Sequence, residues 1–91
     1  MSQVKEHYHA KPMAANSALK TGVCIAGFLC TASGTLTITD ADGTVVVNAL
    51  PVFAPTAPLP FASWIRIPLI SNTSAGFTVQ LAGGAAGTLF L

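Results

Sequence analysis

The sequence predicts an all-β fold, a small antiparallel β-sandwich or a jelly-roll-like barrel with an extended N-terminal arm. Short runs rich in Val, Ile, Thr, Phe and Leu recur from Ser17 onward, and several alternate between apolar and polar residues. Gly, Ser, Asn and Asp separate these runs, and helical spacing is absent. About seven short strands in roughly 75 residues are typical of a sandwich or a jelly roll.

The N-terminal arm is expected over residues 1–16, MSQVKEHYHAKPMAAN. These residues show no sustained period of either kind, they contain Pro12, and their charge differs from that of the rest of the chain. Such a segment is either flexible or ordered only against a neighbour. The sequence therefore divides into an arm over residues 1–16 and one β-sandwich domain over residues 17–91.

Each expected strand lies between clusters of turn residues. The strands cover Ala18–Lys20, Val23–Cys30, Thr35–Thr39, Thr44–Asn48, Trp64–Ile70, Phe77–Ala82 and Thr88–Leu91. Residues 51–60, PVFAPTAPLP, hold four of the six prolines, and proline cannot donate to a sheet ladder. We expect this stretch to be an extended, stiff connection that crosses from one sheet to the other.

A hairpin is expected where the turn residues Asp-Gly separate the third and fourth of these strands. With a two-residue or a four-residue loop, Val45 and Val47 face the core together with Leu36 and Ile38. A loop of odd length would turn Asn48 inward, which costs free energy because its amide would be buried without a partner. The pattern therefore favours an even loop.

The same turn raises the question of a metal site, because it contains Asp40 and Asp42 followed by Gly43. A calcium loop of the EF-hand type needs oxygen ligands at its first and twelfth positions and glycine at its sixth. With Gly43 sixth, those two positions fall on Ile38 and Ala49. We interpret the two carboxylates as turn residues on an exposed tip, where nothing apparent shifts their pKa values.

The chain carries unusually few charges, 8% of its residues against about 25% in ordinary soluble domains. Its formal net charge of +1 provides no field to attract nucleic acid. From Gly43 onward Arg66 is the only charged side chain. Free monomers usually scatter charges and protect sheet edges with lysine. The sequence indicates neither, so we expect a partner to cover much of the surface of this chain.

Neither a membrane span nor secretion is expected. The longest uncharged apolar run near the start, Gly22–Ala32, is shorter than the ~20 residues that cross a bilayer. The first residues are polar, unlike a signal peptide. Cys24 and Cys30 lie in one extended segment, roughly 20 Å apart, so we expect two free, buried thiols and synthesis in the cytoplasm.

The only histidine cluster is His7-Tyr8-His9, in the arm. Two imidazoles two residues apart in an extended chain point to the same side, and a three-fold oligomer would bring six of them to its axis. The alternative, two exposed histidines in a mobile arm, is the commoner situation. We therefore expect no metal and no other cofactor, with His7 and His9 as the weak candidates for a metal site.

Trp64 and Arg66 are expected on one face of a strand, with Ile65 and Ile67 on the other. Tryptophan and arginine are enriched at the centres of protein interfaces, and a tryptophan can also stack on a sugar. A tryptophan filling the end of the sandwich, beside an arginine bonded to loop carbonyls, is an equally good interpretation. The sequence contains no set of nucleophile, base and orienting residue, so we do not expect an enzyme.

The order of these segments resembles that of a small β-rich virion protein of tailed bacteriophages. The resemblance covers residues 17–91 and is carried by the runs GVCIAGFLC, GTLTITD, GTVVVNALPV, PLPF and AGFTVQLAGGAAGTLFL. Proteins of this group are capsid decoration, or cement, proteins and other small virion components, and they are commonly trimeric. The arm is the least similar part.

The resemblance implies a homotrimer that binds the major capsid protein on the outer surface of a phage head and stabilises the shell. We expect the arm to reach the coat protein or a neighbouring trimer, as such arms add contact area when they order on docking. The expected partner-binding residues are His7, Tyr8, His9, Lys11, Pro12, Trp64 and Arg66. The alternatives are a tail, fibre or spike-tip component, and a carbohydrate-binding or host-attachment module.

Overall fold

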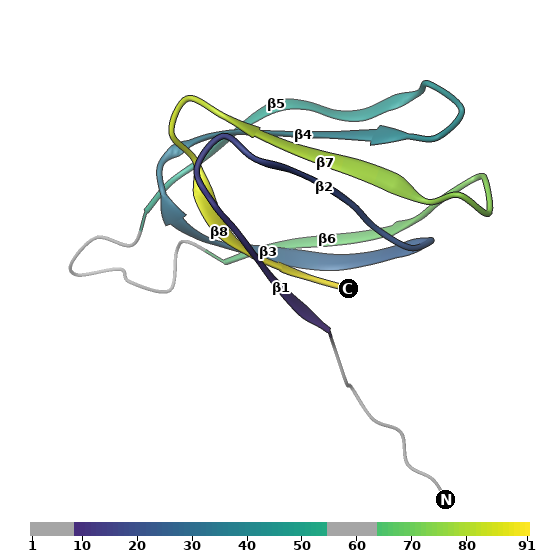
Figure 1. Cartoon of the computed structure of the whole chain (residues 1–91), viewed down its shortest axis with the longest axis horizontal. Helices are drawn as coiled ribbons and strands as arrows, with labels where there is room; N and C mark the ends of the chain where they lie inside the picture. The colour runs from purple at the N-terminus through teal and green to yellow at the C-terminus, as the bar shows by residue number, and fades with distance from the viewer. Residues whose placement is uncertain (1–8, 55–63) are drawn as a thin grey trace, which may run out of the picture.

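The computed structural model describes residues 9–54 and 64–91. Two four-stranded antiparallel sheets pack face to face (Figure 1), which confirms the predicted all-β sandwich. The strands are β1 Ala10–Met13, β2 Ala18–Lys20, β3 Cys24–Ala32, β4 Gly34–Asp40, β5 Val45–Val52, β6 Trp64–Ile70, β7 Phe77–Ala82 and β8 Ala86–Phe90. Sheet A has the order β1-β8-β3-β6 and sheet B the order β2-β7-β4-β5.

The strands pair in the pattern of one long antiparallel hairpin that is folded over into two sheets. Its turn lies between β4 and β5, and β3 then pairs with β6, β2 with β7, and β1 with β8. Two further pairings, β3 with β8 and β4 with β7, join these ribbons into the two sheets. This strand order is that of an eight-stranded jelly roll. The sequence had left jelly roll and other sandwiches open.

The core lies between the sheets and consists of the inward side chains of alternate strand positions. In β7, Phe77, Val79 and Leu81 are at most 2% exposed while Thr78 and Gln80 face outward. The buried apolar residues are Met13, Ile25, Phe28, Cys30, Leu36, Ile38, Val52, Ile67, Phe77, Val79, Leu81, Ala85 and Leu89. Burial of these side chains is the main free-energy gain that holds the two sheets together.

The second half of the predicted arm is a strand of the domain. In β1, Ala10 lies opposite Phe90 and Met13 opposite Gly87, and the Met13 side chain is only 6% exposed. Four residues that include a lysine and a proline carry almost no local β signal, and their partner strand is at the other end of the sequence. Residues 1–8 lie outside the described residues.

The turn of the β4–β5 hairpin has the odd length that the sequence analysis disfavoured. The Gly43 N–H donates to the Asp40 carbonyl at 3.0 Å, and the Asp40 N–H donates to the Thr44 carbonyl at 2.8 Å. Three residues therefore form the loop, and Gly43 takes a positive φ of 94° that glycine adopts without strain. The segment is a turn, as predicted, but the prediction of an even loop length was wrong.

Two irregularities in β5 restore the inward register after this odd loop. Thr39 lies opposite Val45 but Ile38 opposite Val47, so Val46 is an extra residue, and a second shift follows before Leu36. As a result Val47 packs against the core as predicted and Asn48 stays exposed. The prediction that Val45 faces the core was wrong, because it precedes the first bulge and is 52% exposed.

The proline-containing connection begins later than predicted. β5 continues through Pro51 to Val52, with Pro51 opposite Thr35. Proline is tolerated there because β5 is an edge strand with one side free of ladder bonds. The chain then passes from β5 in sheet B to β6 in sheet A, as expected for a connection that crosses between sheets. Residues 55–60 lie outside the described residues.

Candidate interaction surface on sheet A

The outward face of β6 carries the side chains that the sequence placed there. Trp64, Arg66, Pro68 and Ile70 are all exposed, while Ile67 is buried in the core with an exposure of 6%. Trp64 is 44% and Ile70 77% exposed, which are high values for large apolar side chains. We call the outward side of β1, β8, β3 and β6 the outer face of sheet A.

Trp64 is held in place by two neighbours on this face. The strand opposite provides Gly27, where a Cβ atom would lie only 2.5 Å from the indole ring. The ring of Phe90 meets the indole edge-on, with centroids 5.3 Å apart and planes at 79°. Gly27 therefore leaves the space that the indole occupies, and the tryptophan is a positioned, half-exposed platform.

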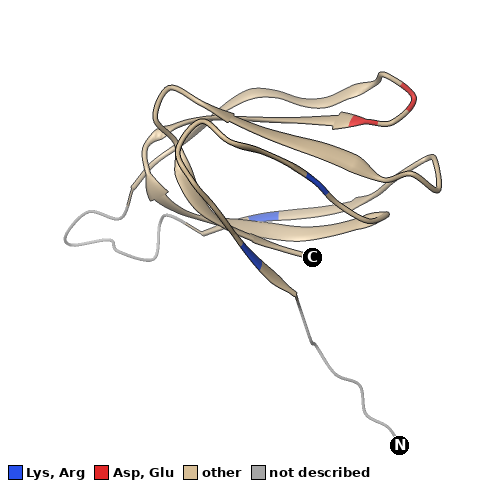
Figure 2. Ribbon diagram, viewed as in Figure 1, with Lys and Arg blue, Asp and Glu red and all other residues tan. Residues whose placement is uncertain are grey.

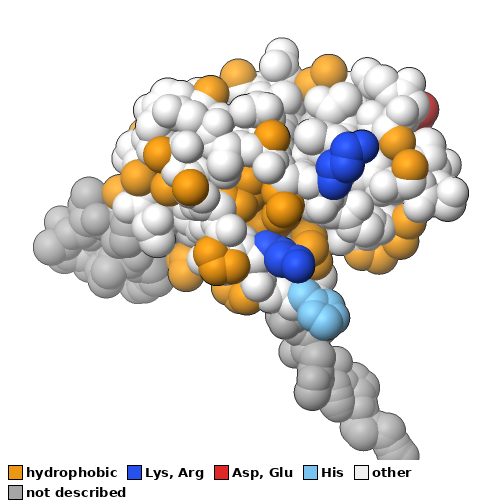
Figure 3. All heavy atoms as spheres, in the orientation of Figure 1, with side chains coloured by type: hydrophobic (Ala, Val, Ile, Leu, Met, Phe, Trp, Pro, Cys, Tyr) orange, Lys and Arg blue, Asp and Glu red, His pale blue; other side chains and the backbone are white. Residues whose placement is uncertain are grey.

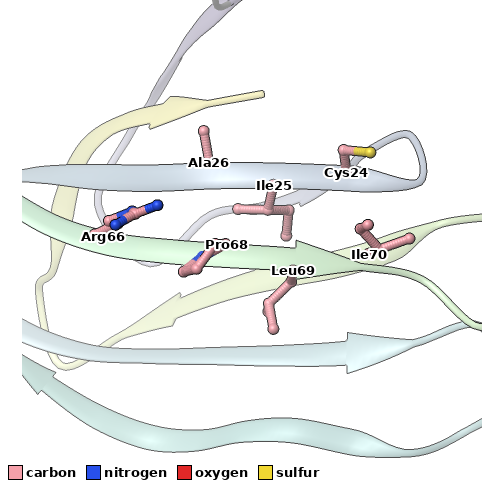
Figure 4. A pocket seen from close by; sticks show the side chains of 7 residues that line it. All are labelled: Cys24, Ile25, Ala26, Arg66, Pro68, Leu69 and Ile70. Atoms are coloured by element: carbon pink, nitrogen blue, oxygen red, sulfur yellow. The ribbon is translucent and has the colours of Figure 1, made fainter.

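A groove lies beside this platform, where the pairing of β3 with β6 is irregular. Ile25 lies opposite Leu69 and Gly27 opposite Arg66, so Ala26 faces the two residues Ile67 and Pro68. Such a bulge interrupts the ladder, and a proline fits there because no N–H is required. The groove encloses about 270 Å³ (Figure 4) and is lined by Cys24, Ile25, Ala26, Arg66, Pro68, Leu69 and Ile70. Arg66 is the only charged residue of this lining.

The bulge also explains the different positions of the two cysteines. They are six positions apart, so a regular strand would turn both side chains the same way, but the irregularity between Ile25 and Gly27 reverses the alternation. Cys24 is exposed beside the groove and Cys30 is buried, where burial raises the pKa of its thiol. Both thiols are free as predicted, but the prediction that both are buried was wrong for Cys24.

The charged side chains of the described residues lie on edge strands and in the β4–β5 hairpin (Figure 2). Lys11 is on β1, Lys20 on β2 and Arg66 on β6, each at the edge of a sheet, and the fourth edge strand, β5, contains Pro51 and two bulges. Figure 3 shows apolar side chains between the two lysines. The prediction that the edges lack protection was therefore wrong, since lysine, proline and bulges all oppose edge-to-edge pairing.

The predicted partner-binding residues of the arm lie partly on sheet A. The exposed His9 exchanges two backbone hydrogen bonds with Leu91, at 3.0 and 2.9 Å. Lys11 and Pro12 are exposed in β1, opposite Leu89 and Thr88. They stand at the edge of sheet A opposite to Trp64 and Arg66, so the structure does not bring the two groups together. His7 and Tyr8 lie outside the described residues.

Asp40 is the buried polar group of the hairpin, with an exposure of 3%. Its carboxylate accepts hydrogen bonds from the Ser71 hydroxyl at 2.6 Å, from the Ala41 N–H at 2.7 Å and from the Asn72 N–H at 2.9 Å. The Ser71 hydroxyl, followed by the Asn72 N–H, lowers the pKa of Asp40. The carboxylate therefore ties the end of β4 to the loop after β6, across the two sheets.

This position corrects the expectation that Asp40 sits on an exposed tip with an unperturbed pKa. Only Asp42 is at the tip, where it accepts the Thr44 N–H at 2.9 Å. The two carboxylates therefore have different surroundings. Among residues 9–54 and 64–91, no group of three or more His, Cys, Asp or Glu side chains could hold a metal ion. The Ser71-Asn72-Thr73 cluster is evident in the sequence, but nothing in the sequence indicates that Asp40 is its partner.

Within the part of the chain that the structure describes, no helix is long and apolar enough to cross a membrane. Comparisons with models of protein families, with curated proteins and with solved structures found no match to this chain. The candidate site therefore rests on its own geometry. That geometry is an exposed tryptophan platform and an adjacent apolar groove with one guanidinium, both on the outer face of sheet A.

Proposed function

We propose that this chain is a non-enzymatic virion structural protein, a capsid decoration protein that binds the outer surface of a phage head as a homotrimer and stabilises the shell. The observation that carries the proposal is the outer face of sheet A. It exposes Trp64 and Ile70 around a single charge, Arg66. Aromatic and arginine side chains amid apolar neighbours are the composition of interface centres.

Three further features support this proposal. The segments of residues 17–91 resemble those of small phage virion proteins in order and composition. The jelly roll recurs in viral capsid domains, which is an argument by analogy of fold. The two packed sheets form a body with one core, and a protein that binds only the assembled shell stabilises that shell by mass action.

The direct test is binding to capsids. The purified chain would be mixed with phage heads that lack their decoration protein and then sedimented, and the heads would be heated with and without it. We expect saturable co-sedimentation at a fixed number of copies per capsid and a higher temperature of capsid disruption. Absence of the chain from purified virions, together with no binding to heads, would refute the proposal.

A second candidate is a carbohydrate-binding module that uses Trp64 as a stacking platform. The specific observation in its favour is the fixed indole, which lies over Gly27 and against Phe90 with 44% of its surface exposed. Lectin domains also use jelly rolls. A glycan array would test this candidate. Binding by the native chain that disappears in Trp64→Ala, with the thermal transition intact, would favour it over the capsid role.

A further inference from the structure

The groove on sheet A has the chemistry to receive a carboxylate between apolar side chains. Its one charge is the Arg66 guanidinium, a planar donor that pairs with carboxylates through two parallel hydrogen bonds. The remainder of the lining is Cys24 and apolar side chains, among them Ala26, Pro68 and Ile70. An occupant that fits therefore carries one acidic group with apolar side chains next to it.

The described residues contain one carboxylate side chain that is free to serve in this way. The chain has three acidic side chains, of which Glu6 lies outside the described residues. Asp40 is buried and accepts hydrogen bonds from Ser71, Asn72 and Ala41. Asp42 is exposed at the tip of the β4–β5 hairpin and has one backbone hydrogen bond, from Thr44.

The surroundings of Asp42 match those of Arg66. Val45 and Val46 follow it in the hairpin and are 52% and 41% exposed. The hairpin tip, defined as residues 41–46, thus presents a carboxylate next to two apolar side chains. The groove presents a guanidinium next to Ile70, which is 77% exposed. The two surfaces are complementary in charge and alike in apolar character, a combination that favours pairing and suppresses other partners.

The two surfaces belong to different sheets. The hairpin tip belongs to sheet B, whereas Arg66 and Ile70 of the groove lie on the outward side of β6, which points away from sheet B. A contact between them therefore joins two copies, and it joins two different patches. Contacts of this head-to-tail kind close into a ring when the rotation between copies allows it.

We propose that the hairpin tip of one copy docks in the sheet A groove of a second copy, with Asp42 paired to Arg66. The inference rests on the homo-oligomer in the proposed function and gives it a specific contact. It also accounts for the exposed valines, which docking removes from water, and for a binding surface that remains on Trp64 beside the occupied groove.

The experiment is charge reversal, read by light scattering coupled to size exclusion over a range of concentrations. Arg66→Glu and Asp42→Lys should each weaken association at least about tenfold, and the double variant should recover most of that loss because the pair is re-formed with opposite sign. Lys20→Glu, on an edge strand of sheet B, is the matched control and should associate like the native chain. Asp42→Asn keeps an acceptor for the Thr44 N–H and should weaken association less than Asp42→Lys.

Cys24 provides a second readout, because it lines the groove and is exposed whereas Cys30 is buried. A thiol reagent should modify Cys24 more slowly as the native chain associates, and this protection should disappear in Arg66→Glu. Thermal melts of every variant establish that it is folded. A monomeric native chain, an oligomer that both single reversals leave intact, or a double variant no better than the singles would each overturn the inference.

Capsid binding measured on the same samples separates the two proposals. If the reversals leave association unchanged while the chain binds heads, the hairpin contact is wrong and the decoration role stands. If each single reversal abolishes association and the double variant restores it, but neither the native chain nor any variant binds heads, the contact is right and the proposed capsid partner is wrong.

Discussion

The outer faces of the two sheets differ sharply, although both sheets cover the same core. On sheet B the outward positions carry Thr35, Thr37 and Thr39 on β4, with Thr78 and Gln80 on β7. On sheet A they carry Trp64, Arg66, Pro68 and Ile70 on β6, with the half-buried Leu29 and Phe90 alongside. Threonine suits a strand surface that water covers, since it combines β-branching with a hydroxyl.

This difference teaches that the low charge of the chain does not leave its surface uniformly apolar. On β4 and β7 of sheet B the outward threonine and glutamine side chains are polar and uncharged, whereas β6 of sheet A leaves Trp64 and Ile70 exposed. The large apolar side chains that sheet B exposes, Val45 and Val46, lie at its hairpin tip. Exposed apolar patches on a folded domain generally mark interaction sites. The outer face of sheet A and the hairpin tip of sheet B are therefore the surfaces that we expect to meet partners.

Truncation of one residue on each face tests this asymmetry most strongly. Trp64→Ala should weaken capsid binding at least about thirtyfold, the effect of losing ~2 kcal/mol at the centre of an interface. Thr37→Ala, on the outer face of sheet B, should leave the affinity unchanged. The two affinities would be compared by co-sedimentation with heads. Equal losses in both variants would show that the faces do not differ in function.

A glycine substitution beneath Trp64 tests how that face is built. In Gly27→Ala the new methyl group would lie 2.7 Å from the Ile65 carbonyl oxygen and 2.5 Å from the indole. Overcrowding of this kind should lower the free energy of unfolding by about 1–3 kcal/mol. Gly22→Ala is the control, because nothing lies within 4 Å of its Cβ position. Chemical denaturation measures both, and a Gly27→Ala variant as stable as Gly22→Ala would contradict the packing described above.

The link between the sheets should depend on pH through Asp40. Since its pKa is below the ordinary value of 3.8, the ionised carboxylate contributes stability above that value, and this contribution is lost as the pH falls through the lowered pKa. The native chain should therefore lose stability in acid more steeply than Asp40→Asn, which should also be less stable at neutral pH. Thermal melts from pH 7 to pH 2 would show this, and parallel curves for the two proteins would refute it.

The smallest effect on stability is expected for Ile70→Thr, which makes the outer face of sheet A resemble that of sheet B. Ile70 is 77% exposed, so the free energy of unfolding should change by no more than about 0.5 kcal/mol. Self-association should nevertheless weaken, since Ile70 lines the groove. A thermal melt and light scattering on one sample test both statements, and a clear loss of folding stability would mean that Ile70 is packed in the monomer.

Local patterns in the sequence were sufficient where strand periodicity is strong. Ala18–Lys20, Trp64–Ile70 and Phe77–Ala82 were predicted with the bounds that the structure shows. The outward direction of Trp64 and Arg66 also followed from alternation along a single strand. These features depend only on which side chains neighbour each other along the chain, and period two is a property of any extended strand.

Three features escaped prediction because they depend on residues distant in the sequence. β1 exists because β8 offers it an edge, and Met13 fills a site in a core assembled from other strands. Cys24 points outward because the register shift against β6 interrupts the alternation of β3. Asp40 is buried because the loop after β6 closes over it with a hydroxyl and an N–H. No window of neighbouring residues contains these partners.

The sequence by itself determined that this protein is built of strands, which residues face outward on β6, and that its charges are few. Only the tertiary structure decided that the strands roll into a jelly roll, that the lysines lie on its edges, and that a groove opens beside Trp64. The physical reason is the separation in sequence over which each kind of interaction acts. Side-chain alternation and turn chemistry act between neighbours along the chain, whereas strand order, bulges and buried carboxylates are settled by hydrogen bonds and packing between segments far apart in sequence.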